Sequence, residues 1–198
     1  SLGGVELRVD EWQIDAVYSG SQKCLSCVPG LSPVSFSDKA AEVIQNRGIA
    51  VQSWFLDQSL VMGYWSGEGK RSYHHTAPVN SLYALHESLV MLQNEGLENS
   101  WARHKAMHDK LSTGLAELGL EFIVPADERL PQLNAVYIPQ GIDDAKVREF
   151  LLNDYNLEIG AGLGAFAGKA WRIGLMGYAA RNENVTLCLA ALKEALKQ

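Results

Sequence analysis

The stretch Tyr18–Leu25, YSGSQKCL, places Lys23 just after a short apolar segment and among small serine and glycine residues. A solvated surface lysine needs no such setting. A lysine that forms a Schiff base does, because its amine must be positioned, partly dehydrated and easily deprotonated. The flanking serines and Gln22 offer neutral hydrogen bonds of the kind that a phosphate accepts, and Gly20 allows a close backbone approach. Two interpretations therefore stand side by side: a solvated loop lysine and a Schiff-base lysine for pyridoxal phosphate.

The composition narrows the classes of partner. Of the 198 residues, 47% are apolar and 20% are charged, which is ordinary for a soluble globular chain. Lys and Arg number 17 against 23 Asp and Glu, which gives a net charge of −6 with no basic block. That balance argues against nucleic acid or an anionic membrane as a partner. The apolar runs are too short to span a bilayer, and no secretory segment opens the chain.

The three cysteines, Cys24, Cys27 and Cys188, form an odd and sparse set. Such a set does not indicate a disulfide framework, so we expect an intracellular, reducing compartment, and the cytoplasm in particular. The Cys24-x-x-Cys27 spacing lacks the thioredoxin-like context or the second pair that redox or zinc chemistry needs. We therefore expect both cysteines to be small packing residues.

The first part of the chain predicts the end of an α/β domain. Strands are expected at 14–18 (IDAVY) and 33–36 (PVSF), where short apolar runs lie between turn signals. Ser37 is placed to cap a helix over 38–47. The region 49–72 is less regular and has the composition of a loop towards its end.

Two consecutive helices are expected next. Thr76 is placed to cap the first, with Pro78 in its first turn, and Gly96 ends it. The second covers 97–118, with Gly119 as its end. The apolar stripe of the first helix consists of Val79, Leu82, Leu85, Leu89 and Leu92.

The last part of the chain alternates short strands and helices. Strands are expected at 121–124, 134–139, 157–160 and 171–176, and helices at 143–155 and 182–197. This pattern predicts a compact α+β domain with mixed strand pairing. We divide the chain into residues 1–98, the end of a large α/β domain with the start of a connecting helix, and residues 99–198, the small domain. Because SLGG (1–4) begins without methionine, signal or helix cap, we expect the chain to be the later part of a larger protein.

The segment YHHTAPV, residues 73–79, is a second candidate site. Its simplest interpretation is a helix entry. The start of a helix is also an anion site, because free N–H groups and the helix dipole favour negative charge, and the hydroxyls of Tyr73 and Thr76 could add donors. A metal site at His74 and His75 is disfavoured, since adjacent side chains usually point apart and no carboxylate has ligand spacing. We expect no metal.

Arg172 lies within the apolar strand segment KAWRIGLMG, residues 169–177. An arginine there is costly to bury unless an anion meets it. That anion could be an internal Asp or Glu, or a substrate carboxylate, which the planar guanidinium binds through two hydrogen bonds. The glycine-rich run 159–168 could form a loop over a small ligand, although its spacing is not that of a dinucleotide-binding fingerprint.

The order of these segments resembles a known family. SGSQK, a following Pro-Gly pair, YHHT-x-PV and then RIGLMG are similar to the alanine–glyoxylate and serine–pyruvate aminotransferases, class V pyridoxal-phosphate enzymes. The resemblance implies an α/β fold, the C-terminal part of a fold type I transferase. It also implies transfer of an amino group from a small amino acid, alanine or serine, to glyoxylate or pyruvate, with (S)-ureidoglycine as another plausible donor.

The resemblance implies a role for each matching residue. Lys23 matches the lysine that forms the internal aldimine and moves the proton at the substrate carbon, and Gln22 matches a cofactor phosphate contact. Tyr73 and Thr76 match residues that reach the phosphate of the neighbouring subunit, which implies a homodimer with shared active sites. Arg172 matches the arginine that binds the substrate α-carboxylate.

Two alternatives remain. Cysteine desulfurases of the same group usually carry histidine before the lysine, where this chain has Gln22, and a loop cysteine that 159–171 lacks. The resemblance also places the aspartate that pairs with the pyridinium nitrogen, and the glycine-rich phosphate cradle, before Ser1. The chain alone is therefore expected to be weakly active or inactive, and its alternative function is that of a catalytically inactive, dimerising or binding module.

Overall fold

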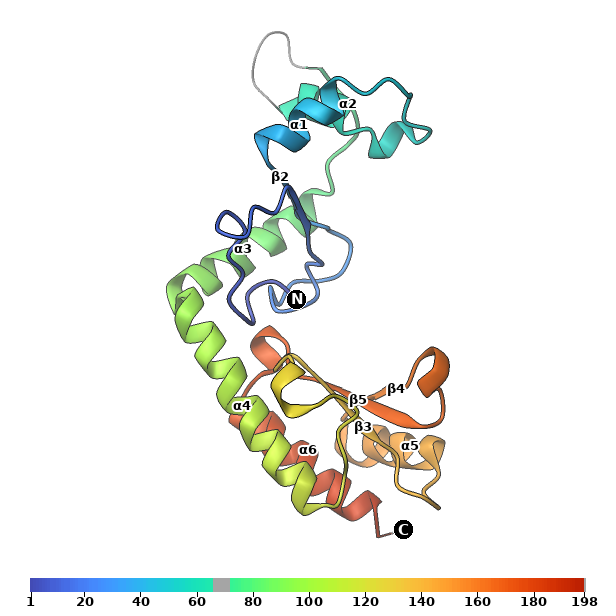
Figure 1. The fold of residues 1–198 in the computed structure, drawn as a ribbon. Coiled ribbons are helices and arrows are strands. Elements are labelled where there is room, and N and C mark those ends of the chain that lie inside the picture. The colour runs from blue at the N-terminus through green and yellow to red at the C-terminus, as the bar shows by residue number, and fades with distance from the viewer. Residues whose placement is uncertain (66–71, 198) are drawn as a thin grey trace.

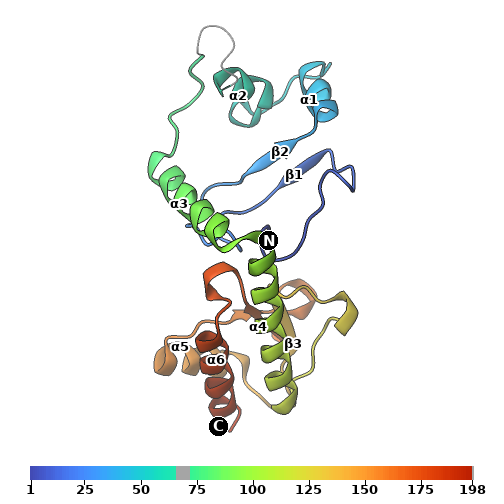
Figure 2. The same cartoon turned by 90° about the vertical axis from the view of Figure 1, so that its left-hand side faces the viewer.

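Two lobes joined by a pair of consecutive helices make up the chain (Figure 1). The computed structural model describes residues 1–65 and 72–197. The first lobe contains the N-terminus and both candidate segments around Lys23 and Tyr73, and the second contains Arg172. Figure 2 shows the second joining helix leading from the first lobe down to the second.

The first lobe is built on two short antiparallel strands, β1 (Ala16–Tyr18) and β2 (Val34–Phe36), with Tyr18 opposite Val34. Both strands lie within the predicted ranges. Neither strand is buried in this chain, and Tyr18 is 83% exposed, because the described residues supply no further strands beside the pair.

Two helices follow β2 at the end of the first lobe. Helix α1 (Asp38–Gln45) has the predicted cap, since the Ala40 N–H donates to the Ser37 hydroxyl at 3.1 Å. A 3-10 turn (Trp54–Leu56) and helix α2 (Gln58–Trp65) occupy the region expected to be irregular. The loop predicted towards the end of 49–72 lies mostly outside the described residues, and residues 72–76 are without helix or strand.

The joining helices are α3 (Val79–Glu95) and α4 (Leu97–Glu117). Gly96 separates them, at a φ of 85° that favours glycine, and its N–H ends α3 by donating to the Leu92 carbonyl. The predicted apolar stripe of α3 is present in the sequence but is not covered, because no residue of α3 is buried in this chain.

The second lobe packs helices on a three-stranded antiparallel sheet, in the order β3 (Leu133–Tyr137), β5 (Ala170–Gly174) and β4 (Gly160–Ala161). The expected mixed pairing is therefore wrong. The strand predicted at 121–124 contributes only one bridge, between Phe122 and Val136. Two further short 3-10 turns, Ala126–Glu128 and Gly164–Phe166, lie in the connections.

Helices α5 (Asp144–Tyr155) and α6 (Asn182–Ala195) complete this lobe, and α6 contacts both α4 and α5 (Figure 1). Its core is apolar and closed, and its fully buried members include Leu111, Leu115, Val136, Leu151, Trp171 and Leu192. No helix in the described ranges is both long enough and apolar enough to cross a membrane. The division at residues 98 and 99, which falls inside the first turn of α4, stays a prediction.

Trp171 is the largest fully buried side chain, and its indole N–H donates to Asp144 Oδ1 at 2.9 Å. We predict that Trp171→Ala lowers the free energy of unfolding by about 3–5 kcal/mol, because it removes a large ring from a closed core. Denaturant unfolding followed by circular dichroism measures this. The control Trp12→Ala, at a half-exposed position, should change it by less than about 0.5 kcal/mol; equal losses would contradict the assignment of the core.

Candidate active site

The turn after β1 holds Lys23 by its backbone and leaves its side chain exposed. The Lys23 N–H donates to the Gly20 carbonyl at 3.2 Å, and the Ser26 N–H donates to the Lys23 carbonyl at 3.0 Å. The buried Ser21 hydroxyl closes the turn by donating to the Val28 carbonyl at 2.7 Å. The fixed backbone positions the amine, which is one of the features that a reacting lysine requires, and the exposed side chain leaves the amine accessible to a cofactor.

The cysteines of this turn pack inward. Cys24 and Cys27 are both free and buried, as is Cys188 in α6. Burial raises the pKa of the Cys24 thiol, and it raises the pKa of Cys188 to about 11. Thiols that resist deprotonation are poor nucleophiles and poor metal ligands. The prediction that Cys24 and Cys27 are packing residues is confirmed.

The second candidate segment brings together two exposed hydroxyls. The Tyr73 hydroxyl and the Thr76 hydroxyl lie 2.5 Å apart. The prediction that Thr76 caps the following helix is wrong: α3 begins at Val79, and Pro78 precedes it without a side-chain cap. The short distance between the two hydroxyls shows instead that the Thr76 side chain points towards Tyr73.

An aromatic cluster holds this segment in place. His74 is buried and stacks on Trp54 with ring centroids 4.0 Å apart. Its Nε2 lies 3.1 Å from the Trp54 carbonyl and its Nδ1 lies 2.7 Å from His75 Nδ1. Since a carbonyl only accepts, Nε2 carries the hydrogen, and His75 Nδ1–H donates to His74 Nδ1. The expectation that these adjacent rings point apart is wrong, because they bond to each other.

The two candidate segments lie at opposite ends of α3. The turn 24–26 shares a cavity with Ser88, Met91 and Leu92, near the C-terminal end of that helix. Thr76 precedes its first residue, Val79. From Val79 to Leu92 the helix rises roughly 20 Å. One chain therefore does not bring Tyr73 and Thr76 to its own Lys23.

Arg172 lies at the middle of β5 and is half-buried. Its Nε–H donates to the Ala161 carbonyl at 2.7 Å. None of the ion pairs between described residues includes it, so the alternative of an internal salt bridge finds no support. A Cβ on Gly160 would lie 3.3 Å from Arg172 Nη2, which shows how closely the glycine-rich run passes the guanidinium.

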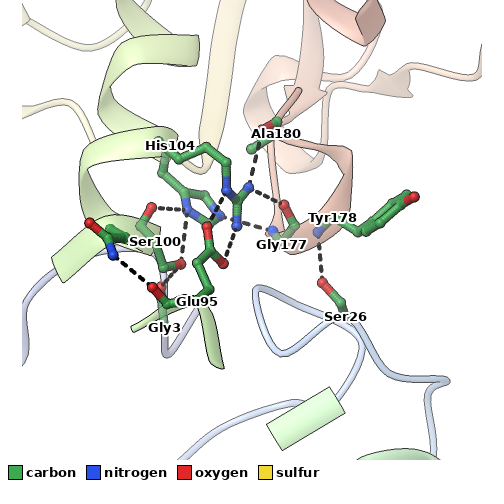
Figure 3. Close-up of polar contacts among 10 residues, drawn as sticks. Gly3, Ser26, Glu95, Ser100, His104, Gly177, Tyr178 and Ala180 are labelled. Carbon is green, nitrogen blue, oxygen red and sulfur yellow. Dashed lines mark hydrogen bonds and ion pairs between the residues drawn. The ribbon is translucent and has the colours of Figure 1, made fainter. Parts of the chain in front are cut away.

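The turn after β5 links the Arg172 strand to the Lys23 turn (Figure 3). It is a 3-10 turn, Gly177–Ala179. The Tyr178 N–H donates to the Ser26 hydroxyl at 2.7 Å. From the other side, the Gly177 N–H donates to Nε2 of the fully buried His104 at 2.9 Å. Neither residue was predicted from the sequence to have a role: His104 belongs to no recognised motif, and Gly177 ends the segment KAWRIGLMG, in which only Arg172 was assigned one.

The comparisons with known proteins agree with these motifs. A family model described as "Aminotransferase class-V" matches residues 1–185. The chain belongs to the class-V aminotransferases. The alanine–glyoxylate aminotransferase of Rattus norvegicus is 44% identical over 199 residues, covering all of this chain and 48% of that protein. The (S)-ureidoglycine–glyoxylate transaminase of Bacillus subtilis (strain 168) is 39% identical over 214 residues, covering 99% and 51%.

Among solved structures, the alanine–glyoxylate aminotransferase from Nostoc sp. is similar with a TM-score of 0.94 and 46% identity, covering 99% of this chain and 52% of that chain. The fold type I architecture predicted from the sequence is confirmed. This chain spans about half the length of the relatives it matches.

The residues of the Lys23 turn fit pyridoxal phosphate. Gln22 is exposed beside Gly20, where a Cβ would lie 2.7 Å from Gln22 Oε1. The Ser19 hydroxyl is buried without a hydrogen-bond partner among the described residues. A buried hydroxyl without a partner is costly unless a ligand bonds to it. The turn thus offers an amine, an amide and a spare hydroxyl close together in the chain.

We predict that His74→Phe loosens the Tyr73–Thr76 segment while keeping the stack on Trp54. The substitution leaves the Trp54 carbonyl and His75 Nδ1–H without partners, at a cost of about 1–3 kcal/mol. Hydrogen exchange read by mass spectrometry should show faster exchange in residues 72–78. His86→Phe, at an exposed site on α3, is the control; unchanged exchange in His74→Phe would refute the role of the cluster.

The burial of His104 leads us to predict that the stability of the chain depends on pH. Burial lowers the pKa of the imidazole most strongly. The hydrogen bond to the Ser100 carbonyl opposes this in part, and the smaller effects of Arg103, which lowers the pKa, and Glu95, which raises it, follow. As the pH falls below about 6.5, the ordinary value, the unfolded chain gains a proton that the folded chain refuses. Stability is therefore lost on acidification. Unfolding between pH 7 and 5 should show a smaller loss for His104→Gln than for the native sequence; equal losses would contradict this.

Proposed function

We propose that this chain carries the lysine and the carboxylate-binding arginine of a pyridoxal-phosphate aminotransferase. The enzyme would move an amino group from a small amino acid, alanine or serine, to glyoxylate or pyruvate. The observation that carries the proposal is the Lys23 turn, whose backbone is fixed at both sides while the amine is exposed. The rat and Bacillus relatives, named for alanine, ureidoglycine and glyoxylate, support this class of substrates and leave the donor open between them.

Each residue has a defined task in this proposal. Pyridoxal phosphate, when bound, supplies the electron sink for the carbanion. Lys23 would hold the cofactor through Nζ, and as a free amine it would move the proton at the substrate Cα. Arg172 would bind the α-carboxylate with its Nη groups, since its Nε–H is already bonded to Ala161. That contact fixes the orientation of the Cα–H bond, and such positioning has a large effect on rate.

The positions of the residues proposed to bind the cofactor phosphate support a homodimer. Gln22 and Ser19 lie on the Lys23 turn, which meets α3 near Leu92, whereas Tyr73 and Thr76 precede its first residue, Val79; the helix rises roughly 20 Å between these two points. A second copy would bring its own Tyr73 and Thr76 to the phosphate. The exposed apolar residues of the first lobe and α3 fit such an association, and they include Tyr18, Val43, Ile49, Trp65, Val79 and Tyr83.

The same exposed apolar residues support the second candidate function, an inactive module that dimerises or binds a partner. The two candidates differ in whether Lys23 reacts with the cofactor. Free and buried cysteines support a reducing, intracellular compartment such as the cytoplasm for either one.

The deciding experiment is an absorbance spectrum of the purified 198-residue chain with pyridoxal phosphate, before and after borohydride reduction. We predict a visible band that disappears on reduction, as the cofactor becomes covalently fixed on Lys23, and we predict that Lys23→Ala shows neither the band nor the fixed cofactor. A native chain with no Lys23-dependent adduct would reject the aminotransferase proposal for this chain and leave the module.

Arg172 provides an independent test of substrate binding. Arg172→Ala should raise the alanine concentration that half-converts the cofactor band by about tenfold to a hundredfold, because a charge-assisted pair is lost. Arg172→Lys should recover only part, since an ammonium cannot form the two parallel hydrogen bonds. An unchanged concentration in Arg172→Ala would contradict the assigned role.

A further inference from the structure

We propose that His104 is a positioning residue that locks the turn Gly177–Ala179 between α4 and the Lys23 turn, and thereby sets Arg172 relative to Lys23. The inference rests on the proposed function for its consequence in substrate binding. The lock itself rests only on contacts in this chain (Figure 3).

The hydrogen bonds of His104 fix its protonation. Nδ1 lies 2.7 Å from the Ser100 carbonyl, which only accepts, so Nδ1 carries the hydrogen. Nε2 lies 2.9 Å from the Gly177 backbone nitrogen, which only donates, so Nε2 carries a lone pair. A neutral imidazole with one defined tautomer satisfies both partners. A second proton on Nε2 would face the Gly177 N–H and break the bond.

A partly buried ion pair between Arg103 and Glu95 binds the same turn beside His104. Arg103 donates to both carboxylate oxygens of Glu95, and its Nη1 donates to the carbonyls of Gly177 at 2.7 Å and Ala180 at 3.1 Å. Helix α3 supplies Glu95 and α4 supplies Arg103 and His104, so the bend between these helices is tied to the turn. His104 alone bonds the turn's first N–H.

On the side away from His104, Gly177 packs directly against Ser26 and Cys24 of the Lys23 turn. A Cβ on Gly177 would lie 1.8 Å from the Ser26 hydroxyl and 2.8 Å from the Cys24 carbonyl. Gly177 also has a φ of 56°, which glycine adopts without strain. Its neighbour Tyr178 bonds Ser26 through its N–H. Any displacement of the turn therefore acts directly on the residues just after Lys23.

The connection from the turn back to Arg172 is stiff. Arg172 pairs with Ala135 in the sheet, and the Leu175 N–H continues this ladder by donating to the Gln132 carbonyl at 2.9 Å. Only Met176 separates Leu175 from Gly177. A shift at Gly177 is thus transmitted along β5 rather than absorbed by a flexible loop.

Arg103 and Glu95 are the charged groups that act on His104, and further titratable groups lie on the elements packed around the turn. Arg103 on its own helix and Glu95 on α3 oppose each other in their effect on its charge. The thiol of Cys24 in the Lys23 turn stays neutral because its pKa is raised by burial. Tyr178 and Arg181 from the turn region stack on each other. The structure therefore predicts that acidification protonates His104 at Nε2 and breaks its hydrogen bond with the Gly177 N–H.

The test compares His104→Leu, which lacks an acceptor, with His104→Gln, whose amide oxygen reaches as far as Nε2 and does not titrate. At pH 8 we expect amide exchange of Gly177 and Tyr178, read by NMR, to rise about tenfold to a hundredfold in His104→Leu, with a rise also at Ser26 and Cys27. His104→Gln should restore most of the protection. The native chain should lose protection as the pH is lowered, and His104→Gln should not.

The control is His108→Gln on the same helix. His108 is also buried, but it bonds Asn134 in β3 through Nδ1 at 2.6 Å. His108→Gln should lower the free energy of unfolding without causing the pH-dependent change in amide exchange at Gly177. Faster exchange confined to residues 177–179, with Ser26 and Cys27 unaffected, would overturn the coupling. So would equal behaviour of His104→Leu and His104→Gln.

Substrate binding separates this inference from the proposed function. With pyridoxal phosphate on Lys23, His104→Leu should keep the adduct and raise the half-converting alanine concentration severalfold. An adduct with an unchanged alanine concentration would overturn the positioning role while the proposed function stands. If the native chain forms no adduct, the proposed function is rejected. The exchange data would still test whether His104 holds the turn Gly177–Ala179 against the Lys23 turn.

Discussion

The contact between Gly177 and the Lys23 turn holds the candidate site together, because the lysine and the arginine belong to different lobes. A methyl group at residue 177 would overlap the Ser26 hydroxyl, so only glycine permits this approach. His104 and Arg103 bind the polar groups of the turn from the opposite side. The turn is thus held from both sides, and the strand that carries Arg172 has little freedom to move relative to Lys23.

The arrangement of α3 divides the proposed phosphate contacts. Its length of 17 residues keeps the Tyr73–Thr76 segment far from the Lys23 turn of the same chain. The aromatic cluster around His74 nevertheless holds that segment in a defined conformation, with both hydroxyls exposed. A segment that is ordered, polar and distant from its own lysine is suited to serve a second copy.

Local signals predicted much of the fold. The Ser37 cap, the Gly96 break and the last helix depend on a few neighbouring residues, and the structure confirms them. Pairing was less predictable: the mixed sheet was wrong because a strand's partners are set by distant contacts. For the same reason Thr76 resembled a cap although its hydroxyl bonds Tyr73.

Sequence motifs predicted the candidate residues Lys23 and Arg172, but they did not predict the residues that hold these two in place. Lys23 and Arg172 stand in recognisable sequence contexts. His104 bonds a backbone N–H 73 positions away, and no local pattern encodes such a contact. The role of Gly177 likewise depends on Ser26, which is 151 positions earlier in the sequence.

The most direct test of a site shared between two copies is a mixing experiment. Chains with Lys23→Ala and chains with Tyr73→Phe and Thr76→Ala are unfolded together, refolded and titrated with pyridoxal phosphate. Each variant alone should lack tight, reducible binding. A hybrid dimer regains one intact site, so the mixture should recover binding on the chain that retains Lys23. A mixture that binds no better than the separate variants would contradict the shared site.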